Sequence, residues 1–358
     1  KSITSDPLTY LESTWAEFGD VVQFPIPKPA TYLITSPEGA REVLVNQHNE
    51  TSKRTLQYNN LSLVTGEGLL TADTQAWRPR RRMLQPAFHK EMIALSEHHI
   101  AAGLAKLDNQ WAELTSVGSA IIDIDHAMMS LALEITCGAL FGIEVDGEVD
   151  EITSATLTAL HGVVARARNP ISLPLSIPTP ANLKMKRAIK RLDKAVDAIL
   201  TSRELNKLPD QAPIRDMLDV LLDPDLETPL TKQQIRDEIV TFIVAGHETV
   251  ASALTWAWHL LVTNPGEMQR LKNDPTRAQL AFDESLRLYP PAWVITRRTL
   301  SDLTVDEVLI PANSLVIVSP WLVHRNPKAW ENPNAFIPDR FLAGSPQLGY
   351  IPFGAGAR

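Results

Sequence analysis

Cysteine is nearly absent from the sequence. One cysteine in 358 residues, Cys137, excludes an internal disulfide framework and excludes zinc sites built from several cysteines, and it is typical of a reducing compartment. Positive charge is not in excess either, because 34 Lys and Arg against 42 Asp and Glu give a net charge of −8. A general nucleic-acid binder neutralises phosphates with a basic face, so this balance argues against nucleic acid as a partner.

Signals for export and repetition are missing as well. No signal peptide opens the chain, and no internal repeat or low-complexity segment follows. We therefore expect a soluble cytoplasmic protein. Both ends of the sequence read as truncated, so an upstream membrane anchor remains an open alternative. The length allows two domains, but one large domain over residues 1–358, incomplete at both ends, fits equally well and is our prediction.

The longest apolar stretch, 238–262, is apolar on nearly every side. A helix of this kind belongs either in a membrane or in the middle of a large core. Gly, His, Glu and Thr at its centre would be costly against lipid, which favours the core. Gly246 is expected to loosen this helix into a π-bulge or kink that opens a groove. Glu248 and Thr249 would then place a carboxylate and a hydroxyl beside that groove, which suits proton delivery.

The rest of the chain is mostly helical, with short strands toward its two ends. Residues 51–76 have little periodicity and read as a long surface loop, a kind of segment that is more often functional than idle. Cys137 lies among apolar residues of a helix expected over 123–142 and reads as a small buried hydrophobe rather than a ligand. We therefore predict a mainly α protein with small β-sheets, and the expected strands lie at 21–26, 30–35, 295–300, 303–311 and 314–320.

Four arginines follow a tryptophan at 77–82. Trp77 and Arg81 are four residues apart and would share one helical face, which suits an anion clamp; the alternative is a basic solvated face. Phe353-Gly354-Ala355-Gly356-Ala357-Arg358 closes the sequence. Its glycines let the backbone approach another body, and its arginine adds a charge for an anion. A phosphate-binding loop is disfavoured there, because no Lys-Ser/Thr and helix follow.

Glu284 and Arg287 lie one helical turn apart. Such a pair taken alone is usually a solvated ion pair. Arg340, in the segment Pro338-Asp339-Arg340-Phe341, could bridge to Glu284 and hold that coil against the helix, since an arginine fork binds carboxylate in a fixed geometry. The alternative for Arg340 is again a surface position.

Taken together, in this order and spacing, these motifs resemble the cytochrome P450 family over essentially the whole chain. Residues 245–249 look like its oxygen-activating helix motif, and Glu284 with Arg287 resembles its E-x-x-R pair. Residues 338–341 are similar to its P-E-R-F segment, 353–358 to the front of its haem-ligand loop, and Trp77 with Arg81 to its W-x-x-x-R motif. The resemblance implies the cytochrome P450 fold, built around the long central helix.

The sequence departs from the family pattern in three places. The family's loop continues from the arginine to x-Cys, so the axial cysteine is expected two residues after Arg358 and no metal ligand lies within the chain. We interpret this ending as truncation because the residues before it are intact; Cys137 lies in a different, apolar helix and cannot replace the ligand. Val250 stands where the family often has a second Thr or Ser, and the usual proline-rich entry segment is absent.

The resemblance implies a monooxygenase with haem b, held by a cysteine thiolate, that inserts one oxygen atom from O2 into an organic substrate. The implied catalytic residues are Ala245, Gly246, Glu248 and Thr249, with the last two relaying protons. The implied haem contacts are Trp77, Arg81, Arg297, Phe353, Gly354 and Arg358. Arg298 is the rival of Arg297, which is favoured because it lies five residues before Asp302, as in the family.

The residues expected to line the substrate pocket are mostly apolar, so we expect a lipophilic substrate such as a fatty acid or terpenoid. They are Phe242, Ala245, Ala292, Val294 and Ile295, with further contacts from 51–76 and 160–182. A ferredoxin, flavodoxin or flavin reductase is the implied electron donor to a monomeric enzyme, and Arg80 and Arg82 are expected to dock an acidic donor.

Two other functions stay open on the sequence alone. A haem-thiolate isomerase or dehydratase would share the fold, and a non-catalytic truncated pseudoenzyme would end at residue 358. The acid–alcohol pair Glu248-Thr249 favours the monooxygenase.

Overall fold

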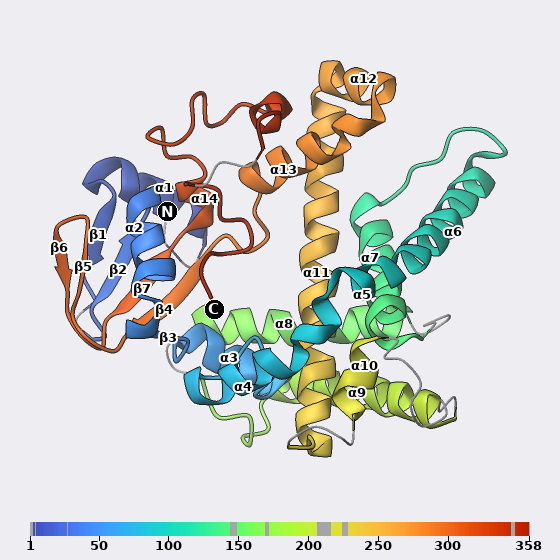
Figure 1. The fold of residues 1–358 in the computed structure, drawn as a ribbon, viewed down its shortest axis with the longest axis horizontal. Coiled ribbons are helices and arrows are strands. Elements are labelled where there is room, and N and C mark those ends of the chain that lie inside the picture. The colour runs from blue at the N-terminus through green and yellow to red at the C-terminus, as the bar shows by residue number, and fades with distance from the viewer. Residues whose placement is uncertain are drawn as a thin grey trace. The chain divides into compact units, whose positions relative to one another are not determined.

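The computed structural model describes residues 3, 5–26, 28–143, 149–168, 172–205, 216–223, 228–344 and 348–357, and it is mostly helical with two small sheets (Figure 1). The prediction of a mainly α protein with small β-sheets is confirmed. The chain forms two compact units, one of Lys1–Thr55 with Ser252–Arg358 and the other of Leu56–Ala251. That division falls inside α11 (Lys232–Thr263), the long helix expected from the apolar stretch. The single domain over 1–358 stays a prediction.

The first unit contains both sheets. The larger has the order β1-β2-β7-β4-β3, in which β2 and β7 are parallel and the other neighbours antiparallel. Its strands are β1 (Val21–Phe24), β2 (Thr31–Ile34), β7 (Leu315–Val318), β4 (Ile295–Thr299) and β3 (Thr51–Ser52), and the hairpin of β5 (Leu303–Val305) and β6 (Val308–Ile310) forms the second sheet. Side chains alternate across β2, so Tyr32 and Ile34 join one apolar cluster and Leu33 another.

The helices of this unit are short and have recognisable ends. Asp6 caps the first by accepting a hydrogen bond from the Thr9 amide at 3.2 Å, and α13 ends just before Tyr289-Pro290-Pro291 because proline cannot continue a helix. They are α1 (Pro7–Phe18), α2 (Pro37–Arg41), the π-helical turn Glu42–Asn46, η2 (His48–Glu50), α12 (Pro265–Asn273), η4 (Pro275–Arg277), α13 (Ala278–Leu288), α14 (Pro320–Val323) and η5 (Pro338–Phe341), with the C-terminal part of α11.

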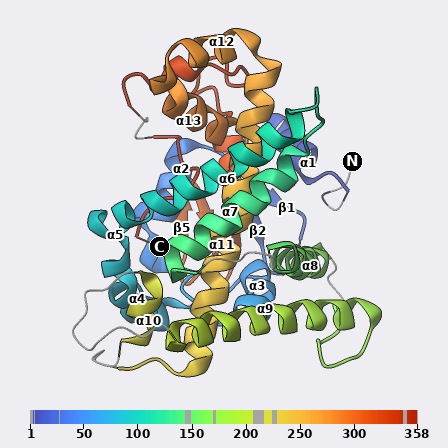
Figure 2. The ribbon, with the colours of Figure 1, turned by 90° about the vertical axis from the view of Figure 1, so that its right-hand side faces the viewer.

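The described residues of the second unit form helices joined by turns and loops, with no strand among them. In Figure 2, α6 and α7 run side by side, and α8 packs on α9. Its helices are α3 (Leu56–Thr65), α4 (Thr74–Leu84), η3 (Gln85–Phe88), α5 (Lys90–Leu95), α6 (Glu97–Thr115), α7 (Ile124–Phe141), α8 (Val149–Arg168), α9 (Pro180–Leu205), α10 (Met217–Leu222) and the N-terminal part of α11.

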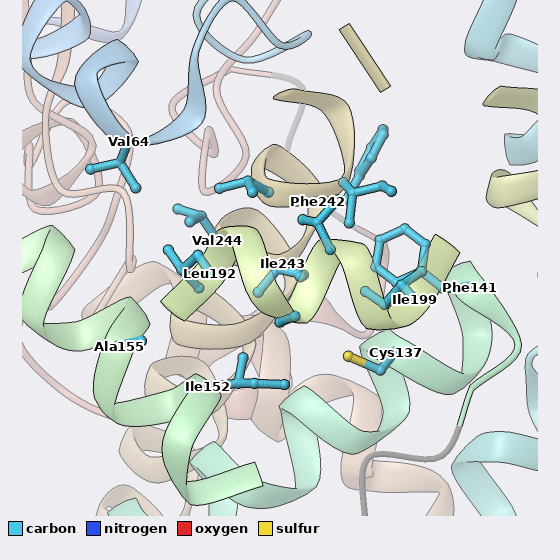
Figure 3. Packing of buried hydrophobic residues seen from close by; sticks show 14 of the residues in the cluster. Val64, Cys137, Phe141, Ile152, Ala155, Leu192, Ile199, Phe242, Ile243 and Val244 are labelled. Carbon is cyan, nitrogen blue, oxygen red and sulfur yellow. The ribbon is translucent and has the colours of Figure 1, made fainter. Parts of the chain in front are cut away.

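The core of the second unit is one apolar cluster contributed by α7, α8, α9, α10 and α11 (Figure 3). Cys137 lies within it, fully buried, and burial raises the pKa of its thiol to about 12. The prediction that Cys137 acts as a small buried hydrophobe is confirmed. Among the described residues, α7 and α11 are long and apolar enough to cross a membrane, and 56% and 50% of their most apolar windows are buried inside the protein.

The long surface loop predicted over 51–76 is wrong. Residues 51 and 52 form β3, and residues 56 to 65 form α3. Helix α3 buries the polar side chains of Asn60 and Thr65 together with Val64. Its apolar residues therefore do not trace a single stripe, which is why the sequence shows little periodicity.

Candidate active site

The middle of α11 changes from a fully buried helix to one with an open face. Residues 239–244 are buried, whereas Ala245 and Glu248 are half-buried and Thr249 is exposed. These last three residues are three and four positions apart, so they share one face of the helix. His247 and Ala251 are buried on the other side. The motif at 245–249 thus presents its alanine, acid and alcohol together.

A π-bulge or a kink was expected at Gly246. The π-bulge is wrong, because α11 is α-helical from Lys232 to Thr263, and the kink stays a prediction. The glycine has another use. A Cβ on Gly246 would lie 2.8 Å from Oγ1 of Thr136 in α7, and that hydroxyl donates a hydrogen bond to the Gly246 carbonyl oxygen at 3.2 Å. Thr249 Oγ1 donates likewise to the Ala245 carbonyl oxygen at 2.5 Å. Because Gly246 has no side chain, α7 can pack directly against the backbone of α11 at the motif.

The two titratable side chains of the motif are in different surroundings. Burial raises the pKa of Glu248, while nearby His161 lowers it and Asp125 raises it. Burial lowers the pKa of His247 to about 4, and its Nε2 lies 3.5 Å from the Thr153 hydroxyl of α8. A carboxyl with a raised pKa on the open face is suited to exchanging protons. The neutral imidazole behind it is a packing group.

Helix α4 carries the predicted anion clamp. Trp77 is half-buried and Arg81 is exposed, with its guanidinium 5.8 Å from the centre of the Phe88 ring. Arg80, one residue earlier, is only 8% exposed. It forms an ion pair with Glu238 of α11 at 3.3 Å. The expectation that Arg80 docks an electron donor is therefore wrong, whereas Arg82 is exposed.

The two rival arginines of β4 point in different directions, because side chains alternate along a strand. Arg297 is 5% exposed and its Nη1 donates to the Thr296 carbonyl oxygen at 3.0 Å. Arg298 is half-exposed and its Nη2 lies 3.5 Å from Asn313 Oδ1. The predicted pocket residues before and within β4 differ in exposure: Ala292 is exposed, Val294 is half-buried and Ile295 is buried. Phe242 is also buried, in the core of the other unit.

The structure brings Glu284, Arg287 and Arg340 together. Arg340 Nε lies 3.3 Å from Glu284 Oε1, and that same oxygen accepts a hydrogen bond from the Ile337 amide at 2.9 Å. Arg287 is fully buried and forms an ion pair with the equally buried Glu284. Its remaining donors bind the carbonyl oxygens of His324, Pro333 and Ala335. This network fixes the irregular C-terminal coil to α13, so neither member of the Glu284–Arg287 pair is a surface residue.

His324 was missed by the sequence analysis. Its Nδ1 lies 3.0 Å from the Arg287 carbonyl oxygen, and its Nε2 accepts a hydrogen bond from the Ile351 amide at 2.8 Å. Complete burial lowers its pKa to about 3, so the ring is neutral. His324 therefore connects the helix that carries Arg287 to the start of the glycine-rich segment. A single histidine in an irregular coil gives no pattern from which this could be predicted.

In the glycine-rich segment, Gly356 lies tightly against another stretch of backbone, whereas Phe353 is exposed to solvent. Gly354 and Gly356 have φ of 79° and 81°, the left-handed region that glycine tolerates. A Cβ on Gly356 would lie 2.1 Å from the Leu44 carbonyl oxygen of the π-helical turn, so the backbones meet there. Phe353 is 84% exposed. Arg358 lies outside the described residues.

The chain is similar to known proteins over nearly its whole length. Residues 5–358 match the cytochrome P450 family model. The chain is 31% identical to cyclooctatin synthase of Streptomyces melanosporofaciens over 98% of this chain and 80% of that protein, and 30% identical to pentalenene oxygenase of Streptomyces avermitilis over 98% and 81%. The crystal structure of CYP175A1 from a strain of Thermus thermophilus is 30% identical and superposes with a TM-score of 0.77 over 99% of this chain and 83% of that one. The chain therefore belongs to the cytochrome P450 family and is a haem-thiolate monooxygenase.

Proposed function

We propose that this enzyme inserts one oxygen atom from O2 into a lipophilic organic substrate, with Thr249 and Glu248 delivering the protons that the reaction consumes. The observation that carries the proposal is the open face of α11, where an exposed hydroxyl and a half-buried carboxyl stand next to each other. Residues 239–244 just before it are buried, so the helix opens to solvent where the acid and the alcohol stand.

The residues of each unit fit haem b. A porphyrin needs apolar surface for its faces and cations for its two propionates. Phe353 is an exposed apolar side chain, and the glycines after it let this segment lie close to another part of the backbone. Val250, on α11, is apolar and 43% exposed. Arg81 offers an exposed guanidinium. When bound through a thiolate, haem supplies the activation of dioxygen.

We assign the propionates to Trp77, Arg81, Arg297 and Arg358, and contacts with the macrocycle to Phe353 and Gly354. An indole N–H and arginine forks are suitable donors to carboxylates. Arg297 is preferred to Arg298 because it lies five residues before Asp302, as the resemblance to the family implies. Gly354 and Gly356 carry no side chains, and their left-handed conformations suit glycine. That part of the backbone is therefore open to contact with the macrocycle.

Thr249 and Glu248 would act in sequence. The Thr249 hydroxyl donates to the Ala245 carbonyl oxygen in this structure, and rotation about its Cα–Cβ bond would let it donate to a bound reactant instead. Burial raises the pKa of Glu248 and so favours its protonated form, which makes this carboxyl a better proton donor than a solvated one. Ala245 is small enough to leave room beside the hydroxyl.

We propose a lipophilic substrate, such as a terpenoid or fatty acid, in contact with Ala245, Ala292 and Val294. Ala245 and Val294 are apolar and half-buried, and Ala292 is apolar and exposed, whereas Phe242 and Ile295 are each buried in the core of their own unit. The name of one relative, pentalenene oxygenase, states pentalenene as its substrate. A lipophilic molecule would gain about 25 cal/mol for each Å² of apolar surface that leaves water.

We further propose that a ferredoxin, a flavodoxin or a flavin reductase reduces a monomeric, cytoplasmic enzyme. Arg82 is exposed on α4 and supplies a positive charge for an acidic donor. We expect no nucleic-acid partner, because a net charge of −8 opposes binding to phosphates.

The test of this function is the fraction of consumed oxygen that appears in product. Thr249→Ala should keep oxygen consumption while the yield of product per oxygen falls about tenfold or more, because a positioned proton donor contributes about 10²–10⁴-fold to its step. Thr249→Ser retains the hydroxyl and should remain close to the parent yield. A parent-level yield in Thr249→Ala would contradict the role given to this hydroxyl.

A further inference from the structure

A buried ion pair joins α4 to α11. Arg80 Nη1 lies 3.3 Å from Glu238 Oε1, and the two side chains are 9% and 0% exposed. The other oxygen, Glu238 Oε2, accepts a hydrogen bond from the Leu69 amide at 2.9 Å. Glu238 thus holds both α4 and the segment that leads into it.

A second contact lies one turn farther along α11. Phe242 is four residues after Glu238 and therefore on the same face of the helix. Its ring centre is 6.2 Å from that of Phe88, and the Phe88 ring lies 5.8 Å from the Arg81 guanidinium. Arg80 therefore contacts one turn of α11 directly, and Arg81 is linked to the next turn through Phe88.

A buried ion pair is a poor source of net stability, because the cost of removing two charges from water offsets their attraction. Burial indeed raises the pKa of Glu238, although Arg80 and the Leu69 amide lower it. What such a pair can provide is a defined geometry. Neighbouring residues on a helix point about 100° apart, so holding Arg80 against Glu238 fixes the direction in which Arg81 leaves α4.

We propose that Glu238 and Arg80 are positioning residues that direct Arg81 toward a haem propionate. This rests on the proposed haem-binding role of Arg81. The pair touches neither substrate nor reacting atoms and acts through the neighbouring side chain. A carboxylate fully buried in the central helix thereby receives a function that the proton-delivery motif, more than two turns away, does not explain.

The rate at which the haem-loaded, full-length natural protein transfers haem to excess apomyoglobin tests this proposal without measuring activity. Glu238→Gln keeps the shape of the side chain and an acceptor for the Leu69 amide but removes the charge that holds Arg80. We expect haem loss to become about tenfold faster. This is the lower end of the effect of replacing a residue that orients a metal ligand. Arg80→Gln should behave alike, and Arg80→Lys, which keeps the charge, should lie closer to the parent.

A double-mutant cycle separates positioning from a general loss of structure. In an Arg81→Gln background the pair has nothing left to direct, so Glu238→Gln should then change the rate of haem loss by less than about twofold. A further tenfold increase in that background would overturn the positioning role, since it would mean that the effect does not pass through Arg81. Should Glu238→Gln not fold, Arg80→Gln, which also breaks the ion pair, gives the same comparison in both backgrounds.

The matched control is Arg82→Gln, two residues along the same helix, where the arginine is exposed; haem loss should stay at the parent rate. The failure of each proposal looks different. If Arg81→Gln retains haem as the parent does, the propionate assignment fails and the inference with it. If Arg81→Gln loses haem faster while Glu238→Gln and Arg80→Gln do not, only the positioning role fails.

Discussion

Arg287 donates through Nε and Nη2 to the two oxygens of Glu284, at 2.7 and 2.8 Å, and neither side chain is exposed to solvent. Replacing one partner leaves the other as an uncompensated buried charge. We expect Glu284→Gln to lower the free energy of unfolding by about 3–5 kcal/mol, measured by urea denaturation.

The control for this pair is Glu134→Gln. Glu134 forms an ion pair with Lys106 at 2.8 Å, but the two side chains are 28% and 41% exposed. The same chemical change should therefore cost less than about 1 kcal/mol. If Glu284→Gln and Glu134→Gln lowered the free energy of unfolding equally, the stabilising effect of the Glu284–Arg287 pair would not depend on its burial.

Much of the fold could be predicted from periodicity and from residues that end helices. The apolar stretch at 238–262 predicted the central helix, although α11 begins six residues earlier because its first turns are polar and do not extend the apolar run. Four of the expected strands were also found, as β1, β2, β4 and β7. The strand expected over 303–311 is instead the hairpin of β5 and β6, because the chain turns at Asp306 and Glu307. Helix α3 was missed because Asn60 and Thr65 occupy buried positions, so no apolar stripe marks it.

The candidate site was less predictable than the fold, since its geometry depends on contacts between distant segments. Glu284 and Arg287 alone are typical of a surface pair, and only their packing against the C-terminal coil buries them. Arg80 and Arg81 are identical in kind and adjacent, yet one is buried on Glu238 and the other is exposed. The reason for Gly246 was also out of reach, because its partner in α7 lies 110 residues away along the chain.

The contact between Thr136 and Gly246 gives a second prediction. Gly246→Ala would place a methyl group 2.8–2.9 Å from the Thr136 side chain, so we expect a cost of about 1–3 kcal/mol in unfolding free energy. Adding Thr136→Ala should recover part of it, because that side chain is the obstacle. Gly266→Ala is the control: nothing lies within 4 Å of the added Cβ in α12, and we expect no loss or a gain of about 0.4–1 kcal/mol. If Thr136→Ala restored none of the stability lost in Gly246→Ala, the clash with Thr136 would not be the cause of that loss.

Buried His324 predicts sensitivity to acid. Its pKa in the folded protein is about 3, against an ordinary value of about 6.5, so between these pH values the unfolded chain binds a proton that the folded protein does not. The free energy of unfolding should therefore fall as pH drops below about 6.5, by up to about 1.4 kcal/mol per pH unit for this group. His247, with a pKa of about 4, acts in the same direction. Urea denaturation at pH 7 and pH 5 measures the slope, and His324→Asn should reduce it; an unchanged slope would argue against a neutral buried ring.

The exposed Arg82 predicts a salt-dependent reaction with an acidic electron donor. Arg82→Glu should slow reduction by an acidic ferredoxin at low ionic strength and weaken the dependence of that rate on salt, because attraction between opposite charges speeds encounter. Stopped-flow measurement of the reduction rate against salt concentration gives both quantities. Lys194→Glu makes the same charge change at a position of α9 and should have a smaller effect. Identical behaviour of the two variants would rule out a specific role for Arg82.

A lipophilic substrate should change the spin state of the enzyme. Titrating terpenoids or fatty acids into the haem-loaded, full-length natural protein should convert low-spin to high-spin absorption, because a molecule seated beside Ala245 would exclude water from the haem site. Difference spectroscopy follows the conversion. Ala245→Phe should fill the space and abolish the shift while the haem spectrum without substrate persists. A shift caused only by charged, hydrophilic compounds would contradict the lipophilic assignment.

The most direct test of the whole account is the absorption spectrum of the reduced, carbon-monoxide-bound, full-length natural protein. A haem held by a thiolate, with Arg81 and Arg297 on its propionates, should give a strongly red-shifted Soret band in the parent and a lower haem content in the Arg81→Gln and Arg297→Gln variants. A colourless protein despite ample haem, or a Soret band without that shift, would contradict the account.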